Sequence, residues 1–133
     1  MLKSWWRAMA CAVLLGSAVT VLAAVDLEEF DGDVMRAMDD AFKDLEPVLG
    51  ASNVEGAKAD LFVLKEGYQW TLEYFQVERG APEAASINQA GQLLLADIER
   101  AIEQRDFAAA VGKARDLQAN CKSCHQKYRP KKQ

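Results

Sequence analysis

Apolar residues recur at steps of three and four along the chain from about residue 27 onward. This period is typical of amphipathic helices. The pattern predicts four helices, at about 27–49, 54–78, 82–104 and 107–128. Few runs look like strands, so we expect an all-α fold. Because the links between the helices are short, they favour an antiparallel up-down four-helix bundle.

The predicted helix ends carry residues that helix termini prefer. Ser52 or Asn53 can cap the start of the second helix, and Asp106 can cap the fourth. Pro82 suits the first turn of the third helix, where a missing backbone N–H costs nothing. Gly67 falls inside the second helix, at a cost of about 1 kcal/mol relative to alanine. This glycine is either tolerated or marks the close approach of another helix or a haem.

The apolar stripes also predict the core. The stripe positions in chain order are Leu27, Phe30, Val34, Met38, Phe42 or Ala41, Leu45 and Leu49 or Val48, then Val54, Ala57, Leu61, Leu64, Tyr68, Leu72 and Phe75, then Ile87, Gly91 or Ala90, Leu94, Ile98 and Ile102 or Ala101, with Leu93 and Leu95 beside them, then Phe107, Ala110, Ala114, Leu117, Cys121, Cys124 and Tyr128.

The fourth helix contains Cys121-Lys122-Ser123-Cys124-His125, in which CxxC directly precedes the only histidine of the chain. This spacing is the attachment signature of a c-type haem. Each thiol forms a thioether with a haem vinyl group, and the imidazole becomes an axial ligand of the iron. Residues three and four apart share a helix face, so all three side chains can face one macrocycle. We therefore expect one covalent haem c, placed against the core.

Two other uses of the cysteine pair fit less well. A structural zinc site needs four ligands, usually as two spaced pairs, and the chain has one pair and one histidine. A thioredoxin-like redox pair would accompany a βαβ pattern, which is not visible. A haem-free thiol-redox or metal module remains the remote alternative.

The first 23 residues have the pattern of a signal peptide. Lys3 and Arg7 precede an uncharged apolar run at Ala8–Leu22, and a small-residue cleavage pattern follows. We expect residues 1–23 to direct export and residues 24–133 to form the mature domain, free of the membrane. The run is short for a span of roughly 20 residues, although an uncleaved anchor stays open. Export to the periplasm agrees with haem attachment, which in bacteria occurs outside the cytoplasmic membrane.

Charge is distributed unevenly along the chain, which carries −4 in total. Residues 26–46 contain nine acidic residues and two basic ones, whereas residues 113–133 contain seven basic residues and one acidic one. These charges are either solvated helix faces or a basic rim that steers an acidic redox partner to the haem. The acidic net charge, without interleaved aromatic and basic residues, argues against nucleic-acid binding.

Two methionines near the start of the first helix are candidates for the second axial position. Up-down connectivity places this start at the same end as the finish of the fourth helix, so Met35 and Met38 can face the haem. Methionine is a common partner of histidine in electron-transfer haems. Methionines at helical spacing are also ordinary core residues.

The segment from Cys121 to Arg129, near the C-terminus of an exported all-α chain, resembles the class II c-type cytochromes, the cytochrome c-prime family. The resemblance implies a four-helix bundle with the haem between the first and fourth helices. It also implies one early distal residue in the first helix, with apolar positions about three, seven and ten residues later. Aligning the distal residue with Met35 places Met38, Phe42 and Leu45 at those steps.

The resemblance therefore favours Met35 as an iron ligand and Met38 as core. One position departs from the family, because Asp31 stands where an arginine often lies near a haem propionate. Tyr128 and Arg129 match the family's tail, and Arg129 would tune the iron electrostatically or cap the helix. Members of the family also form homodimers.

The features together favour an electron carrier over an enzyme, since no titratable constellation accompanies the expected haem. We expect a periplasmic c-type cytochrome with axial ligands His125 and Met35. The alternative is a five-coordinate haem protein that binds NO or CO in an apolar pocket around Met35 or Phe42.

Overall fold

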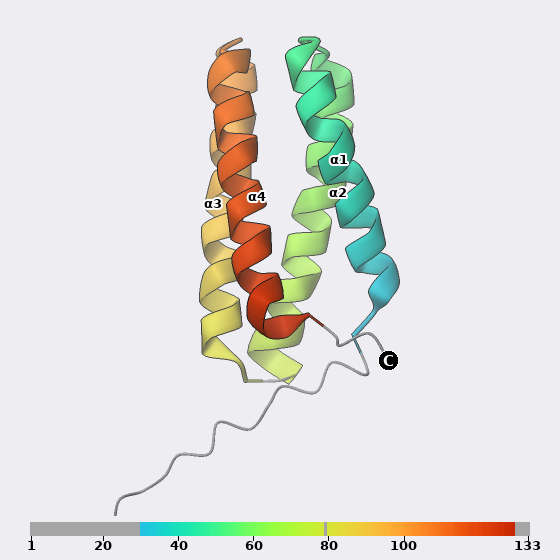
Figure 1. Cartoon of the computed structure of the whole chain (residues 1–133), viewed down its shortest axis with the longest axis vertical. Helices are drawn as coiled ribbons and strands as arrows, with labels where there is room; N and C mark the ends of the chain where they lie inside the picture. Colours follow the sequence, from blue (N-terminus) through green and yellow to red (C-terminus); the bar gives the residue numbers. More distant parts are fainter. Residues whose placement is uncertain (1–29, 79, 130–133) are drawn as a thin grey trace, which may run out of the picture.

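The computed structural model describes residues 30–78 and 80–129 and is helical throughout (Figure 1). Its elements are α1 (Gly32–Gly50), α2 (Val54–Glu73), the π-helical turn η1 (Tyr74–Glu78), α3 (Pro82–Glu103) and α4 (Phe107–Tyr128). No strand occurs among the described residues. The predicted all-α fold with four helices is confirmed. The predicted signal peptide lies outside the described residues.

The helix ends follow the predicted caps, with one correction. Asn53 accepts a hydrogen bond from the backbone N–H of Gly56, and Asp106 caps α4 in the same way. The predicted start of the first helix near residue 27 is wrong for the described part, because Phe30 and Asp31 precede α1. The Asp31 carboxylate accepts the N–H of Asp33 at 2.9 Å, which caps the helix at that point. Residues 27–29 lie outside the described residues.

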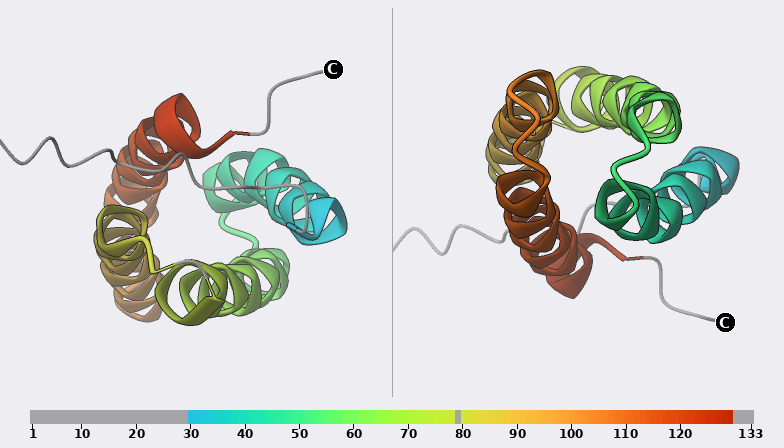
Figure 2. Two further views of the ribbon diagram at one scale, coloured as in Figure 1. Left: turned by 90° about the horizontal axis from the view of Figure 1, so that it is seen from below. Right: turned by 90° about the horizontal axis from the view of Figure 1, so that it is seen from above.

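The four helices stand side by side around a common centre (Figure 2). The α1–α2 and α3–α4 connections lie at one end of the bundle, and the α2–α3 connection lies at the other (Figure 1). Packing is most extensive between α3 and α4 and between α1 and α2, and it is least extensive between α1 and α4 among the helix pairs in contact. The site described below involves all four helices, and its candidate ligands lie on α1 and α4.

The apolar stripes form the core largely as predicted. Its most deeply buried large side chains are Leu45, Leu49, Leu64, Leu95, Ile98 and Leu117. Burying one such side chain stabilises a fold by roughly 1.5–3 kcal/mol. On α3 the stripe is rotated relative to the prediction, because Leu95 is buried and Leu94 only partly so. Leu93 is 70% exposed.

A second apolar group, which we call the aromatic cluster, consists of Phe30, Trp70, Tyr74, Phe75 and Tyr128. The Phe30 ring meets Trp70 and Tyr74 edge-on, with centroids 4.9 and 5.0 Å apart. Phe75 and Tyr128 lie 5.3 Å apart in a similar geometry. Such pairs contribute about 0.5–1.5 kcal/mol beyond their buried area. The cluster thereby fastens the last turn of α4 to the end of α2.

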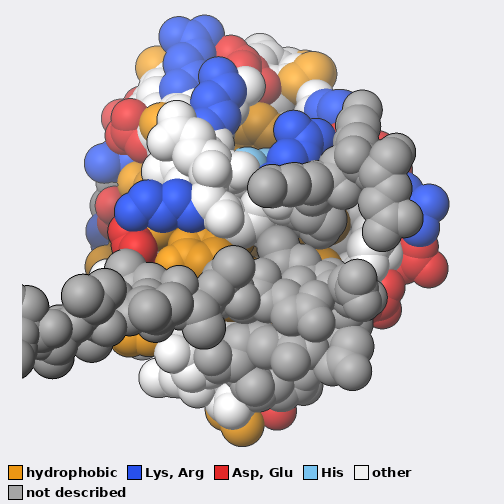
Figure 3. Space-filling view, turned by 60° about the horizontal axis from the view of Figure 1, so that its bottom comes forward, with side chains coloured by type: hydrophobic (Ala, Val, Ile, Leu, Met, Phe, Trp, Pro, Cys, Tyr) orange, Lys and Arg blue, Asp and Glu red, His pale blue; other side chains and the backbone are white. Residues whose placement is uncertain are grey.

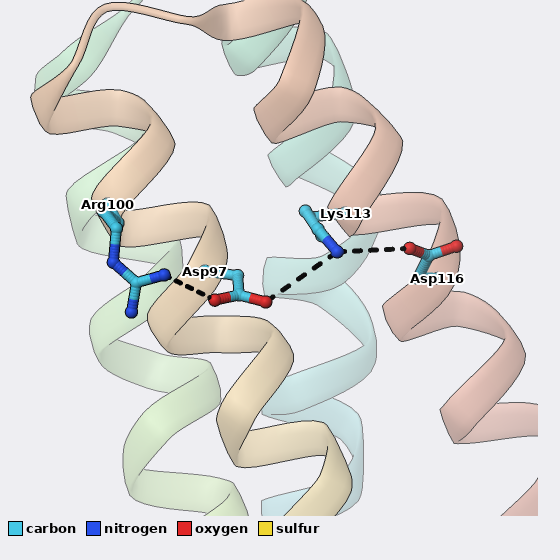
Figure 4. Close-up of polar contacts among 4 residues, drawn as sticks. All are labelled: Asp97, Arg100, Lys113 and Asp116. Atoms are coloured by element: carbon cyan, nitrogen blue, oxygen red, sulfur yellow. Dashed lines mark hydrogen bonds and ion pairs between the residues drawn. The ribbon is translucent and has the colours of Figure 1, made fainter.

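Ion pairs link neighbouring helices at the surface. Lys113 on α4 lies between Asp97 of α3, at 3.8 Å, and Asp116 of its own helix, at 3.9 Å (Figure 4). Arg100 pairs with the same Asp97 at 2.9 Å. Two further pairs between helices are Lys65 with Glu99 and Arg115 with Glu46. Exposed pairs contribute about 0–1 kcal/mol each, so they adjust the alignment of the helices more than they stabilise the fold.

Two glycines allow helices to approach closely. A Cβ atom at Gly67 would lie 2.3 Å from Cγ of Met38, so α1 packs directly on the backbone of α2. A Cβ atom at Gly91 would lie 2.2 Å from Cε1 of Tyr68 and 2.5 Å from Oδ1 of Asn120. Gly67 therefore marks a close helix approach, one of the two interpretations left open by the sequence.

We predict opposite effects of alanine at two helical glycines. Gly91→Ala should lower the free energy of unfolding, because overpacking costs about 1–3 kcal/mol and both neighbours are held rigidly. That cost exceeds the helix-propensity gain of about 1 kcal/mol. Gly112→Ala, with nothing within 4 Å of the new methyl group, should raise the free energy of unfolding. Urea denaturation measures both, and equal stabilisation by the two substitutions would contradict the packing at Gly91.

Candidate functional site

A single open cavity of about 230 Å³ brings together most of the residues singled out by the sequence. Cys121, Cys124 and His125 reach it from α4, and Met35 and Met38 reach it from α1. The other residues that line it come from all four helices and are Asp39, Phe42, Leu64, Tyr68, Thr71, Ile87, Asn88, Gln118, Asn120 and Lys122. Arg129 is not among them. It follows Tyr128 as the C-terminal cap of α4.

The two thiols are half-buried and are not joined in a disulfide. Burial raises the pKa of Cys121. Burial, and then the neighbouring Cys121, raise the pKa of Cys124 to about 11. Both thiols are therefore protonated at neutral pH. Redox-active CxxC pairs have lowered pKa values instead, so this environment disfavours a thiol-redox module.

His125 stands at the mouth of the cavity, one residue beyond Cys124, and its side chain is exposed. Partial burial of the ring, and then the charge of Arg129, lower its pKa. The imidazole is thus neutral near pH 7 and keeps a nitrogen lone pair. A neutral imidazole is the form that binds a metal.

The two methionines of α1 occupy different environments. Met38 is 8% exposed and packs on α2, where a Cβ atom at Gly67 would lie 2.4 Å from its sulfur. Met35 is half-buried, lies one turn earlier and lines the cavity without belonging to the buried core. The core therefore holds Met38 in place, whereas Met35 faces the same space as His125 from the other side.

A polar wall lines the α2–α3 side of the cavity. The Tyr68 hydroxyl donates to Oδ1 of Asn120 at 3.0 Å and lies 3.5 Å from Sγ of Cys121. Asn88 donates to the carbonyl oxygen of Tyr68 at 2.8 Å, and Thr71 donates to that of Gly67 at 2.7 Å. Burial, followed by the proximity of Cys121, raises the pKa of Tyr68, so the phenol stays neutral.

Sequence reasoning assigned Tyr68 to the core and overlooked Asn88 and Asn120. The hydrogen-bonded pairs are separated by 20 residues in one case and 52 in the other. No local pattern connects residues so far apart. The one local sign in the sequence is that the polar residue Asn120 directly precedes Cys121, which belongs to the apolar stripe of the fourth helix.

The turn that carries His125 is attached to the start of α3. Lys127 forms an ion pair with Glu83, and the hydroxyl of Tyr128 donates to the same carboxylate at 3.4 Å. The hydrogen bond and charge of Lys127 lower the pKa of Glu83. Since Tyr128 also packs on Phe75, the last turn of α4 is held from two sides.

Both signs of charge border the cavity. Lys122 of α4 and Asp39 of α1 contribute to its lining. On the face turned forward in Figure 3, Lys and Arg side chains stand close to the visible histidine surface, beside exposed apolar surface. Because Asp39 lies on α1 and Lys122 on α4, the lining of the cavity is mixed in charge. The steering of a redox partner by a basic rim stays a prediction.

This set of residues fits a c-type haem. Two protonated thiols one turn apart on a single helix lie next to a neutral imidazole, a thioether sulfur lies on the facing helix, and much of the lining is apolar. Within residues 30–78 and 80–129, no group of three or more His, Cys, Asp or Glu side chains is arranged to hold a metal ion.

Comparison of the chain with models of protein families, with curated proteins and with solved structures found no match. In the part of the chain that the structure describes, no helix is long and apolar enough to cross a membrane.

We predict that Lys127→Met raises the pKa of Glu83 toward its ordinary value. A carboxyl whose pKa is lowered on folding contributes stability above its unfolded pKa, and this stability is lost as the pH falls. With Lys127→Met, the stability of the last turn of α4 should therefore depend less on pH in the acid range. Carbon NMR titration of the Glu83 carboxyl measures the change. Lys122→Met, which removes a lysine of the same helix that does not pair with Glu83, is the control and should leave that titration unchanged.

Proposed function

We propose that the chain is an exported c-type cytochrome that carries single electrons in the periplasm. One observation supports it most: Cys121, Cys124 and His125 line the same cavity as Met35, which comes from the other end of the described chain. The spacing CxxCH alone would fit many surroundings. A shared cavity with a thioether sulfur on the facing helix fits the ligand set of an electron-transfer haem.

In this proposal the four helices form an antiparallel up-down bundle with the haem between α1 and α4. Cys121 and Cys124 would hold the macrocycle through thioether bonds, and His125 and Met35 would bind the iron. When bound, the haem supplies an iron that accepts and returns one electron. The protein contributes ligands, a low-dielectric cavity and a surface for docking, and it makes or breaks no substrate bonds. Residues 1–23 would direct export as a signal peptide.

Met35 is the proposed sixth ligand because its neighbour has another role. The sulfur of Met38 is packed against Gly67, and moving it to the iron would open a void in the core. Met35 is only partly buried, and its side chain already lines the cavity. Burial, and then the charge of Arg129, lower the pKa of His125, so Arg129 is the residue that would act electrostatically on this ligand.

A gas-binding protein is the second candidate. Phe42 and Leu64 give the cavity an apolar wall near Met35, the kind of surface that surrounds NO or CO in a five-coordinate haem protein. The two candidates differ only in whether the sulfur of Met35 occupies the sixth position. A thiol-redox or metal module remains third, and the raised pKa values of Cys121 and Cys124 disfavour it.

We predict that the denatured protein gives a positive covalent haem stain and that the native protein gives low-spin spectra in both oxidation states. Met35→Ala should abolish the low-spin spectra, whereas Met38→Leu should retain them, because only the first removes a ligand. Absorption spectra of both oxidation states measure the outcome. A high-spin ferrous spectrum of the unaltered protein that shifts on addition of NO or CO would favour the gas-binding candidate. A negative stain would exclude a covalent haem altogether.

The redox partner in this proposal is a protein that presents acidic residues to the α4 side of the cavity. Lys122 lies on that rim and is exposed. Charges near a docking site act mainly on the association rate and on its dependence on salt. Asp39, on the α1 side, would act in the opposite direction and so orient the partner toward α4.

We predict that Lys122→Gln slows electron exchange with the anion ferricyanide and accelerates exchange with the cation hexaammineruthenium. Asp39→Asn should produce the reverse pattern. Stopped-flow rates at low salt measure both effects, which should diminish at high salt because the charges are screened. If Lys122→Gln changed both rates in the same direction, electrons would not leave through this rim.

A further inference from the structure

A hydrogen-bonded chain leads from α3 through α4 to α2 and ends beside Cys121. The side chain of Tyr68 is 5% exposed, and its hydroxyl donates to Oδ1 of Asn120 at 3.0 Å. The same hydroxyl oxygen lies 3.5 Å from Sγ of Cys121, the first haem-attachment sulfur. Tyr68 is thus the polar group of the cavity wall in contact with an attachment sulfur.

The neighbours of Tyr68 determine the direction of its hydroxyl. Nδ2 of Asn120 donates to the carbonyl oxygen of Ile87 at 2.8 Å, so Oδ1 of that amide must face Tyr68. An amide oxygen is a strong acceptor, whereas a thioether sulfur is a weak one. The hydroxyl proton therefore stays on the side of Asn120. The oxygen lone pairs, which carry the negative end of the dipole, point toward Cys121.

The surroundings hold this arrangement rigidly. Gly91 of α3 leaves room for both partners, since a Cβ atom there would overlap Tyr68 and Asn120. Asn88, which is 4% exposed, donates to the backbone carbonyl of Tyr68, and Gln92 in turn donates to Asn88 at 2.8 Å. The tyrosine is therefore fixed at its backbone, its ring and its hydroxyl.

We propose that Tyr68, oriented by Asn120, is a positioning residue that holds down the reduction potential of the haem attached at Cys121. This inference rests on the proposed function. A partial negative charge beside the macrocycle favours the oxidised form, which carries one more positive charge. The effect is strengthened in a buried, low-dielectric wall. Hydrogen bonding and burial around a haem are among the features by which a protein sets its potential.

The test is the midpoint potential of the haem-loaded protein and of four variants, three single and one double. Tyr68→Phe keeps the ring and removes the dipole, so the potential should move in the positive direction. Thr71→Val is the matched control. It deletes a hydroxyl from the same helix and the same cavity wall, but that hydroxyl donates to Gly67 and contacts no attachment sulfur. Its potential should change less than that of Tyr68→Phe.

Asn120→Leu reverses the dipole instead of deleting it. Without Oδ1, the nearest acceptor among the contacts of Tyr68 is the sulfur of Cys121, and the hydroxyl proton turns toward the haem. The potential should then rise further than in Tyr68→Phe. In the Tyr68→Phe background, Asn120→Leu should cause a smaller rise than it does alone. A residue that only supports packing would not produce this ranking of the midpoint potentials.

Several results would overturn the inference while leaving the proposed function intact. These are an unchanged or lowered potential in Tyr68→Phe, an equal shift in Thr71→Val, or additive shifts of Tyr68→Phe and Asn120→Leu. All of these would occur in a protein that carries haem and gives low-spin spectra. A negative haem stain of the unaltered protein would instead remove the proposed function and this inference together. If Tyr68→Phe does not fold, as judged by circular dichroism, the midpoint potentials of Asn120→Leu and Thr71→Val are compared instead. A higher potential in Asn120→Leu supports the inference, and an equal or lower one overturns it.

Discussion

The helical period of α4 constrains the rest of the molecule, because one face of this helix must fill the core at one end and present two thiols at the other. Ala110, Ala114 and Leu117 are buried, and Cys121 and Cys124 continue the same face into the cavity. The small side chains near the start of α4 allow close packing on α3. Because α3 holds α4 in the bundle, α4 does not depend on close packing against α1 near the thiols.

A cavity inside a small bundle leaves fewer packing contacts. The packing on both sides of the cavity compensates for these missing contacts. On one side the core is dense, with several large side chains almost completely buried. On the other side the aromatic cluster joins the last turn of α4 to α2, and Glu83 attaches that turn to α3. The polar wall between them is satisfied internally by hydrogen bonds, which avoids the cost of buried unpaired groups.

Electrostatics around the cavity follow from which helices are neighbours. The chain is acidic near its start and basic near its end, but packing brings the two segments together, and Arg115 pairs with Glu46. The asymmetry along the sequence is therefore partly cancelled in space, and residues of both signs, Lys122 and Asp39, line the cavity. Inside the cavity, burial dominates instead and keeps both thiols, the imidazole and the phenol of Tyr68 neutral.

The sequence by itself determined the helices, their caps and the stripes that fill the core, because these depend on residues within one or two turns of each other. It also identified Cys121, Cys124 and His125, whose spacing is local. The start of α1 at the Asp31 cap is a local contact as well, although the apolar pattern placed that start too early. Tertiary structure alone decided which methionine packs on Gly67 and that Leu95 rather than Leu94 faces the core. It alone joined Tyr68 to Asn120 and Cys121, since that contact depends on how three helices pack at Gly91.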